Sequence, residues 1–397
     1  MTLIQPLQSK CGVSVDKQAA FIQHQSDPVT CFDQLREQEC PAHVNKVQWP
    51  LLRHEDIVNA LHDPQTFSNC VSSHLQVPNG MDPPQHTAYR QLLDPFFAAE
   101  RLALFQPIAT AVARNVLSTL PRANSIEVMK NWATPYALQI LAAFMGWPRR
   151  YQRPLADWIK AQQKATHEQD RAALQHLATT FDSTIREIIS LRKNSSHYQD
   201  VTAELCQLRV NGRLLKDEEL VSIVRNWTVG ELGTIAAAIG SIVVFLTRHP
   251  NLQMMLRNRT DLIDYSVDEI LRIDAPLLSN RRRTTCPVHI GGDDLVADTE
   301  VTILWSAGNR DPRVFAQPKQ FRFDRDPDKN LLYGKGIHRC PGEPFARLVL
   351  NTFVREMLAM YPTLDLAITK PLRAKYPSGG YEKAYIQNPG RSKRRRS

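Results

Sequence analysis

The sequence predicts one large, mainly helical domain with a minor β portion, on three observations. The chain has 397 residues, of which 43% are hydrophobic and 22% charged, a composition that allows a large buried core and excludes a disordered or fibrous chain. It holds 26 Pro against 16 Gly, which favours helices separated by proline-rich loops. Helical periodicity runs from about residue 56 to residue 276 without a linker-like stretch. We therefore expect one domain over 1–390 and a basic tail at 391–397.

The stretch 56–276 contains the clearest helical patterns. After a short β pattern at 44–52, apolar residues recur at three- and four-residue spacing over 170–191 and 218–246. The first of these helices is expected to end before Asn194, and the second before Pro250.

Strand patterns follow the helices. Residues 286–290 and 300–304 predict two strands, separated by a Gly291-Gly292 turn. A region rich in Asp, Pro, Gly and Arg at 309–342 predicts a long loop, and helix resumes at 343–361.

Charge and cysteine content narrow the class of protein. The net charge is +9, but the tail RSKRRRS carries five positive charges, so the rest of the chain carries only +4. We interpret the tail as a solvated end and expect no nucleic-acid partner. Seven scattered Cys without a C-x-x-C pair argue against a disulfide scaffold or a structural zinc site. The N-terminus shows no signal-peptide pattern, and the longest apolar run, 13 residues at 234–246, is too short to span a bilayer. We expect a cytoplasmic monomer without a membrane anchor.

The segment YGKGIHRCPG at 333–342 contains the most informative cysteine. Cys340 stands in a loop directly before a predicted helix, with Gly334 upstream. Glycines permit a tight turn and the close approach of a flat ligand. Backbone N–H groups at a helix start favour a thiolate. Such a thiolate serves either as a nucleophile or as a metal ligand.

This segment resembles the haem-ligand loop of the cytochromes P450, F-x-x-G-x-x-x-C-x-G, with Tyr333 in place of the usual Phe. Four further motifs in the same order extend the resemblance over most of the chain. The resemblance implies the cytochrome P450 fold, a triangular helix-rich single domain, and haem b as the cofactor. It also implies that Cys340 is the axial ligand of the iron and that Gly334 belongs to the cofactor site.

The second motif is Glu269-x-x-Arg272, in which the two side chains are neighbours on a helix. It resembles the family's E-x-x-R motif, which forms a buried network with an Arg from the loop before the Cys. Arg325 is our candidate for that third member. The implied role is structural, because the network fixes the loop that presents Cys340.

The third and fourth motifs supply candidate partners for the haem propionates. His86 and Arg90 in DPPQHTAYR resemble the family's H-T-x-x-R segment. In NRRRTTCPVHIGG, counting back from the Gly291-Gly292 turn favours Arg282, with Arg281 as the alternative. His338, two residues before Cys340, resembles another propionate partner. Four basic side chains suit two carboxylates.

The fifth motif lies on the long helix, in VGELGT at 229–234. The family places an acid before an alcohol here, and these groups supply protons for O–O cleavage. The spacing to Glu269 assigns Thr234 as the alcohol, so Gly233 replaces the acid and Glu231 stands where Gly is usual. Glu231 shares a helix face with Thr234. Three roles remain open for it: a proton source through water, a site for a polar or basic substrate group, or a solvated or core-paired residue.

The resemblance implies a monooxygenase that inserts one atom of O2 by hydroxylation or oxidative dealkylation. Electrons would come from a ferredoxin and its reductase, with Lys335, Arg339 and Arg347 as a candidate docking patch. The substrate is expected to be a small or medium hydrophobic molecule. The candidate pocket walls include Val229, Leu277 and Leu278, with the stretches 67–76, 158–167 and 377–385.

Two alternative functions follow from the same residues. The Gly at position 233 leaves open a peroxide-driven peroxygenase or another non-standard haem-thiolate enzyme. A non-catalytic haem- or ligand-binding protein is the third possibility.

Overall fold

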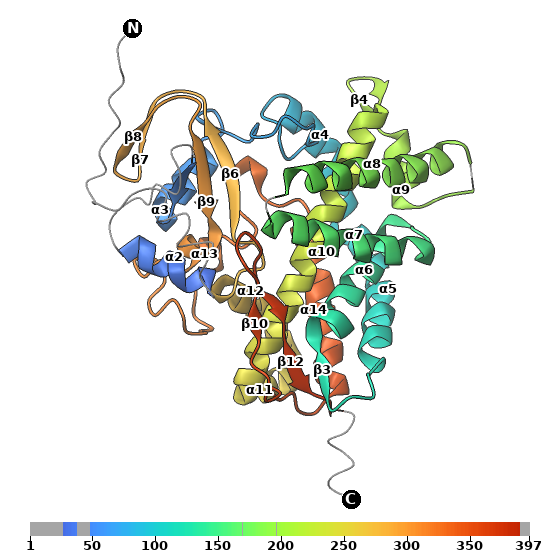
Figure 1. Ribbon diagram of the computed structural model, residues 1–397, viewed down its shortest axis with the longest axis vertical. Coiled ribbons are helices and arrows are strands. Elements are labelled where there is room, and N and C mark those ends of the chain that lie inside the picture. Colours follow the sequence, from blue (N-terminus) through green and yellow to red (C-terminus); the bar gives the residue numbers. More distant parts are fainter. Residues whose placement is uncertain (1–26, 38–47, 169, 196, 390–397) are drawn as a thin grey trace, which may run out of the picture.

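The computed structural model describes residues 27–37, 48–168, 170–195 and 197–389, so the basic tail lies outside the described residues. Most of the long helices gather on one side of the molecule, and the main sheet lies on the other with α2, α3 and α13 beside it; α10 runs between the two sides (Figure 1). The predicted mainly helical domain with a minor β portion is confirmed. The helices are α2 (Pro28–Glu37), α3 (His54–His62), α4 (Gln85–Leu93), α5 (Ala99–Ser118), α6 (Thr134–Met145), α7 (Gln152–His167), α8 (Arg171–Lys193), α9 (Val201–Gln207), α10 (Asp217–Arg248), α11 (Pro250–Asn258), α12 (Ile263–Ile273), α13 (Trp305–Asn309) and α14 (Glu343–Met360).

Local sequence signals set the helix ends. The Asp170 side chain accepts a hydrogen bond from the Ala173 N–H at 2.9 Å and begins α8, as an N-cap residue does. Three acidic residues in the first turn of α10 complement its dipole, and Pro250 begins the next helix. The helices predicted over 170–191 and 218–246 therefore differ from α8 and α10 only at their ends.

Helix α10 is the central element of the core. It packs against α6, α8 and α12, while α5 packs along α14. Of the described helices, α10 alone is long and apolar enough by itself to cross a membrane, but 61% of its most apolar window is buried inside the molecule. Its hydrophobicity is thus accounted for by core packing.

The main sheet has four strands in the order β1-β9-β6-β2. β1 pairs in parallel with β9, whereas β6 is antiparallel to both β9 and β2. These strands are β1 (Gln48–Leu51), β2 (Phe67–Ser68), β6 (Ser279–Thr284) and β9 (Glu300–Leu304).

Both predicted strands are present: β9 coincides with 300–304, and β7 (Val288–Ile290) covers the second part of 286–290. β7 forms a hairpin with β8 (Asp293–Leu295), which was not predicted. Gly291 and Gly292, with φ of 62° and 84°, form its two-residue turn, which requires positive φ at both positions. The three arginines at 281–283 lie within β6, which precedes β7 in the chain. The remaining strands form small pairs: β3 (Ser125–Glu127) with β12 (Tyr385–Gln387), β4 (Arg209–Val210) with β5 (Arg213–Leu214), and β10 (Leu372–Arg373) with β11 (Tyr381–Lys383).

Candidate functional site

The loop before α14 is fixed by backbone contacts. The Cys340 N–H donates to the Tyr333 carbonyl at 2.9 Å. Gly334 and Gly336 have φ of 69° and 68°, which favours glycine. A Cβ on Gly336 would lie 2.2 Å from the Leu61 carbonyl oxygen of α3. Position 336 therefore requires Gly because α3 packs directly against the loop.

Cys340 is exposed at the end of this loop, yet protein atoms surround it closely. Burial raises the pKa of its thiol to about 11, although the Gly342 N–H donates to the sulfur and lowers that pKa. The nearby carboxylates Glu231 and Glu343 raise it further. A metal cation that binds the sulfur would release this proton.

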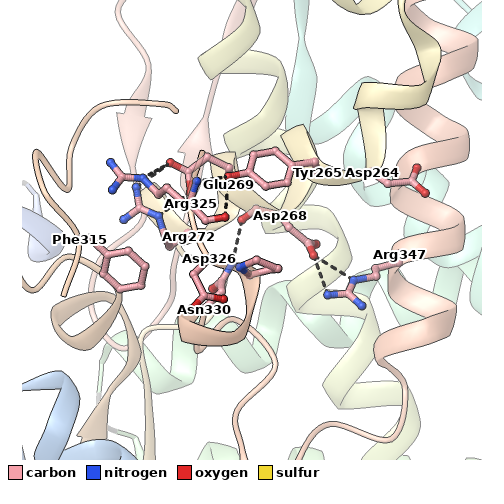
Figure 2. A pocket seen from close by; sticks show the side chains of 11 residues that line it. Asp264, Tyr265, Asp268, Glu269, Arg272, Phe315, Arg325, Asp326, Asn330 and Arg347 are labelled. Atoms are coloured by element: carbon pink, nitrogen blue, oxygen red, sulfur yellow. Dashed lines mark hydrogen bonds and ion pairs between the residues drawn. The ribbon is translucent and has the colours of Figure 1, made fainter. Parts of the chain in front are cut away.

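Glu269, Arg272 and Arg325, here called the Glu269 network, form a buried group of ion pairs (Figure 2). The Arg272 Nε donates to Glu269 Oε2 at 2.6 Å, and the Arg325 Nε donates to Oε1 at 2.7 Å. Arg272 also donates to the Asn309 carbonyl, while the Asn309 side chain accepts from the Leu331 N–H at 2.7 Å. The network thus connects α12 to the loop that leads to Cys340.

A cavity of about 270 Å³ lies beside this network. Its lining includes Glu269, Arg272 and Arg325 from the network, with Asp268 and Arg347 beside them (Figure 2). The Arg347 guanidinium donates to Asp268 Oδ2 at 2.7 Å. Because its lining is charged and internally paired, and Cys340 is not part of it, we assign this cavity to the scaffold rather than to the chemistry.

A second group of charged and polar side chains surrounds His338 of this loop. It is here called the His86 cluster and consists of His86, Arg90, Arg282 and His338. The His86 and His338 ring centroids lie 4.2 Å apart, with the ring planes tilted by 57°. Burial, together with the neighbouring His86, Arg282 and Arg90, lowers the pKa of His338 to about 3. Burial also lowers the pKa of Arg282 to about 10. Burial therefore makes positive charge on Arg282 and His338 less favourable than it would be in water.

The His86 cluster fits an anionic group. Within the described ranges, His86 Nδ1 and His338 Nε2 are buried and have no hydrogen-bond partner. The nearest carboxylate to His338 Nε2 is Asp82, at 3.8 Å, and it already accepts hydrogen bonds from Ser68 and Asn69. Buried polar groups without partners are uncommon in proteins. Two carboxylates of a haem would satisfy these groups.

The structure separates the two candidate arginines on β6. Arg282 is 6% exposed and belongs to the cluster, whereas Arg281 lies on the other face of the strand and pairs with Glu300 at 3.3 Å. Arg90 has a second task, because its guanidinium donates to Asp94 and to the carbonyls of Ile337 and Arg339. These bonds attach α4 to the Cys340 loop.

On α10, Thr234 and Glu231 have different surroundings. The Thr234 hydroxyl donates to the Gly230 carbonyl at 2.5 Å, within its own helix. Burial raises the pKa of Glu231 to about 8. A Cβ on Gly230 or Gly233 would meet no described atom within 4 Å, so this side of the helix borders open space.

The Glu231 carboxylate points toward the Cys340 loop. A Cβ on Gly342 would lie 3.8 Å from Glu231 Oε1, 4.0 Å from Cys340 Sγ and 4.0 Å from the Phe97 ring. Sulfur and carboxylate therefore border the same small region, which α10 and the loop enclose from different elements.

Among the predicted pocket walls, Val229 and Leu277 are 39% and 40% exposed. The expectation for Leu278 is wrong: this side chain is fully buried and packs with Phe32, Leu52 and their neighbours in a separate core cluster. Leu277 and Leu278 point in opposite directions because they continue into a strand, and residue 277 forms a β-bridge with Ser378.

The stretch 75–77 is bound to α10 by four hydrogen bonds and is here called the 75–77 strap. The Ser222 hydroxyl accepts from the Val77 N–H and donates to the Leu75 carbonyl, both at 2.8 Å. Arg225 and Asn226 donate to the carbonyls of Leu75 and Val77 at 2.8 and 3.1 Å. Arg225 also binds Asp182 of α8 at 2.7 Å.

The predicted docking patch is largely neutralised. Arg339 donates to both oxygens of Glu343, at 2.5 and 2.7 Å, and Arg347 pairs with Glu343 and Asp268. Lys335 remains the third member. Two functional candidates were missed from the sequence: Asp82, which stands four residues before His86, and Asn309, which links Arg272 to the loop. Asp82 belongs to the segment DPPQHTAYR, so its proximity to His86 was the available signal.

Comparison with known proteins agrees with this geometry. The family model described as Cytochrome P450 matches residues 143–364. The cyclomarin C epoxidase CymV of Salinispora arenicola is 26% identical over 335 residues, covering 80% of this chain and 84% of that protein. The probable cytochrome P450 127A1 of Sinorhizobium fredii is 28% identical over 327 residues, which cover 80% of this chain and 78% of that protein.

Solved structures share the fold. The Bacillus subtilis cytochrome P450 PksS superposes with a TM-score of 0.83 at 23% identity, covering 91% of this chain and 97% of that one. A mutant of P450 EryK in complex with erythromycin B gives a TM-score of 0.81 at 22% identity, covering 94% and 97%. The chain belongs to the cytochrome P450 family. It is a cytochrome P450 monooxygenase whose cofactor is haem iron.

Proposed function

We propose that this enzyme holds haem b through Cys340 and inserts one atom of O2 into a small or medium hydrophobic substrate. The observation that carries the proposal is the His86 cluster beside the Cys340 loop, because its buried polar atoms without hydrogen-bond partners in the described chain suit two propionates. Haem iron with an axial thiolate supplies the oxidising chemistry. In this proposal Cys340 binds the iron, His86, Arg282 and His338 hold the propionates, and Arg90 and Gly334 shape the loop.

The test of this proposal is the carbon monoxide spectrum of the haem-loaded, reduced protein. A thiolate-bound haem gives a red-shifted Soret band, which Cys340→Ala should abolish. Cys286→Ala is the matched control because Cys286 is also exposed but lies beside Thr66, outside the site. The proposal fails if the wild type lacks the band or if Cys340→Ala keeps it.

For proton supply, we propose that Thr234 provides the alcohol and Glu231 the acid that the family places at position 233. The face on which Gly230 and Gly233 lie leaves room for water and substrate. The peroxide-driven alternative follows from the missing acid at Gly233. Comparing turnover on reduced ferredoxin with turnover on peroxide separates the two: a substantially higher rate on peroxide favours the alternative.

We propose a ferredoxin with its reductase as the electron donor and the cytoplasm as the location. The pairing of Arg339 and Arg347 with acidic residues reduces the positive charge available for docking. Lys335→Glu should therefore lower the apparent affinity for an acidic ferredoxin only severalfold. An unchanged affinity would remove Lys335 from the docking surface.

The names of similar proteins support a hydrophobic substrate. They include a polyketide biosynthesis cytochrome P450 and a structure in complex with testosterone. The exposed side chains of Val229 and Leu277 provide an apolar surface near the open face of α10. A screen of apolar compounds for a haem spin-state change would identify the substrate class, and a panel in which only polar compounds respond would contradict it.

A further inference from the structure

Glu231 is the acidic group nearest to the chemistry, and its position suggests a role beyond proton supply. Its Oε1 and the Cys340 sulfur lie 3.8 and 4.0 Å from one point, the position of a Cβ on Gly342. Glu231 belongs to α10, whereas Cys340 belongs to the loop before α14. The carboxyl group and the sulfur thus approach this region from different elements.

The hydrogen bonding of the Glu231 carboxyl group is incomplete within the described residues. Its Oε2 is buried and has no hydrogen-bond partner in the described part of the chain. Burying a carboxylate without a cation or donor is costly. The cations around the loop are engaged elsewhere: Arg90 binds Asp94 and two loop carbonyls, and Arg339 binds Glu343.

The group that best completes this arrangement is the metal held by the sulfur. Carboxylate oxygen is a hard anionic ligand, which suits ferric iron. Resting on the proposed haem-thiolate function, we propose that Glu231 would serve with Cys340 as a ligand of the haem iron in the substrate-free enzyme. The carboxyl group would lose its proton to solvent on binding the metal, and no oxidant or reductant would be consumed. Substrate that enters along the open face at Gly230 and Gly233 would displace the carboxylate, which would take up a proton from solvent before it could supply one.

The decisive experiment identifies the sixth ligand directly. The ferric, haem-loaded protein is prepared in water enriched in oxygen-17, and hyperfine coupling to the iron is measured by electron–nuclear double resonance. Without substrate, we expect no coupling from a water ligand in the wild type, and clear coupling in Glu231→Ala and Glu231→Gln. Glu218→Gln, the same change at an exposed position of α10, should behave like the wild type. A water coupling in the wild type overturns the proposal.

A second measurement tests the same bond by competition. Imidazole must displace the carboxylate in the wild type, so Glu231→Ala should bind imidazole at least about tenfold more tightly, equivalent to about 1.4 kcal/mol. Glu218→Gln should leave this affinity unchanged. Equal affinity of the wild type and Glu231→Ala contradicts the proposal.

Different results would contradict the haem-thiolate function and the proposed role of Glu231. Absence of the thiolate band under carbon monoxide removes the haem-thiolate function itself. A normal band together with water as the sixth ligand leaves that function intact and removes only the role of Glu231. If the Glu231 variants bind no haem, the wild-type measurement in enriched water alone decides.

Discussion

The Glu269 network and the His86 cluster both lie beside the Cys340 loop, but they differ in how their buried charged and polar groups are paired. In the network, the Glu269 carboxylate receives hydrogen bonds from two arginines, and those arginines also donate to backbone carbonyls. In the cluster, two arginines and two histidines share space with Asp82, and buried ring nitrogens lack partners among the described residues. A charge group that is complete within the chain stabilises the fold, whereas one that is incomplete is arranged for a ligand.

The largest expected effect comes from removing the carboxylate of the Glu269 network. Glu269→Ala leaves Arg272 and Arg325 buried without their carboxylate, so the free energy of unfolding should fall by about 3–5 kcal/mol. Urea unfolding of the haem-free protein measures this loss. Glu204→Ala removes a carboxylate that pairs with Arg101 at the surface, and should cost under about 1 kcal/mol. Equal losses for the two variants would contradict the distinction.

Removing a charge from the His86 cluster should not lower the free energy of unfolding of the haem-free protein. Arg282→Met relieves the charge repulsion on His338 and the burial of a guanidinium, so the free energy of unfolding should stay constant or rise by about 1 kcal/mol. The haem-loaded form should instead lose its cofactor about tenfold faster, because a propionate loses a charged partner. Haem transfer to an apoglobin measures the release rate. A haem-free protein that loses more than about 2 kcal/mol would place Arg282 with the structural charges.

A third charge group tests the same distinction through pH. Glu219 accepts hydrogen bonds from Arg213, Tyr89 and the Lys216 N–H, and its pKa is lowered from 4.5 to about 2, chiefly by Arg213. Because the folded-state pKa is the lower one, this contribution is complete above pH 4.5 and is lost as pH falls toward 2. Screening at the half-exposed Arg213 limits it to about 1 kcal/mol.

Glu219→Gln should therefore remove about that much pH dependence from urea unfolding between pH 5 and pH 3. Asp261→Asn, which alters an exposed pair with Arg259, serves as the control. An unchanged pH dependence in Glu219→Gln would show that this group is not a complete structural charge group.

The smallest expected effect is that of Arg281→Gln. Arg281 is the neighbour of Arg282 on β6 but pairs with Glu300 on the other face, where its side chain is 50% exposed. We expect a change in unfolding free energy within about 0.5 kcal/mol and an unchanged haem release rate. A release rate as fast as that of Arg282→Met would reverse the assignment of the two arginines.

Sequence patterns predicted the long elements and the motifs better than the short strands. The helical periods of 170–191 and 218–246 located α8 and α10, because long amphipathic or buried helices repeat their pattern over several turns. The strand predicted over 286–290 begins two residues later in the structure, and its partner β8 was not predicted, because a short strand carries little information about its partner and the two glycines specify only a turn. The small strands near the C-terminus were not predicted for the same reason.

Within the site, the sequence identified residues but not their partners. The structure brings Arg325 to Glu269 across 56 positions of the chain, as the motif resemblance implied, whereas the role of Asn309 depends on tertiary contacts alone. Leu278 was misplaced because alternation along a strand hides one of two adjacent leucines. The orientation of the Glu231 carboxylate toward the loop could not be read from helix spacing, which fixes a face but not the direction of a long side chain.

The 75–77 strap is joined to α10 by four hydrogen bonds, and the bond from Arg225 to Asp182 adds α8 to the same unit. Movement of the strap away from α10 would break all four bonds at once. Deuterium uptake at the Val77 amide would measure how often the strap opens.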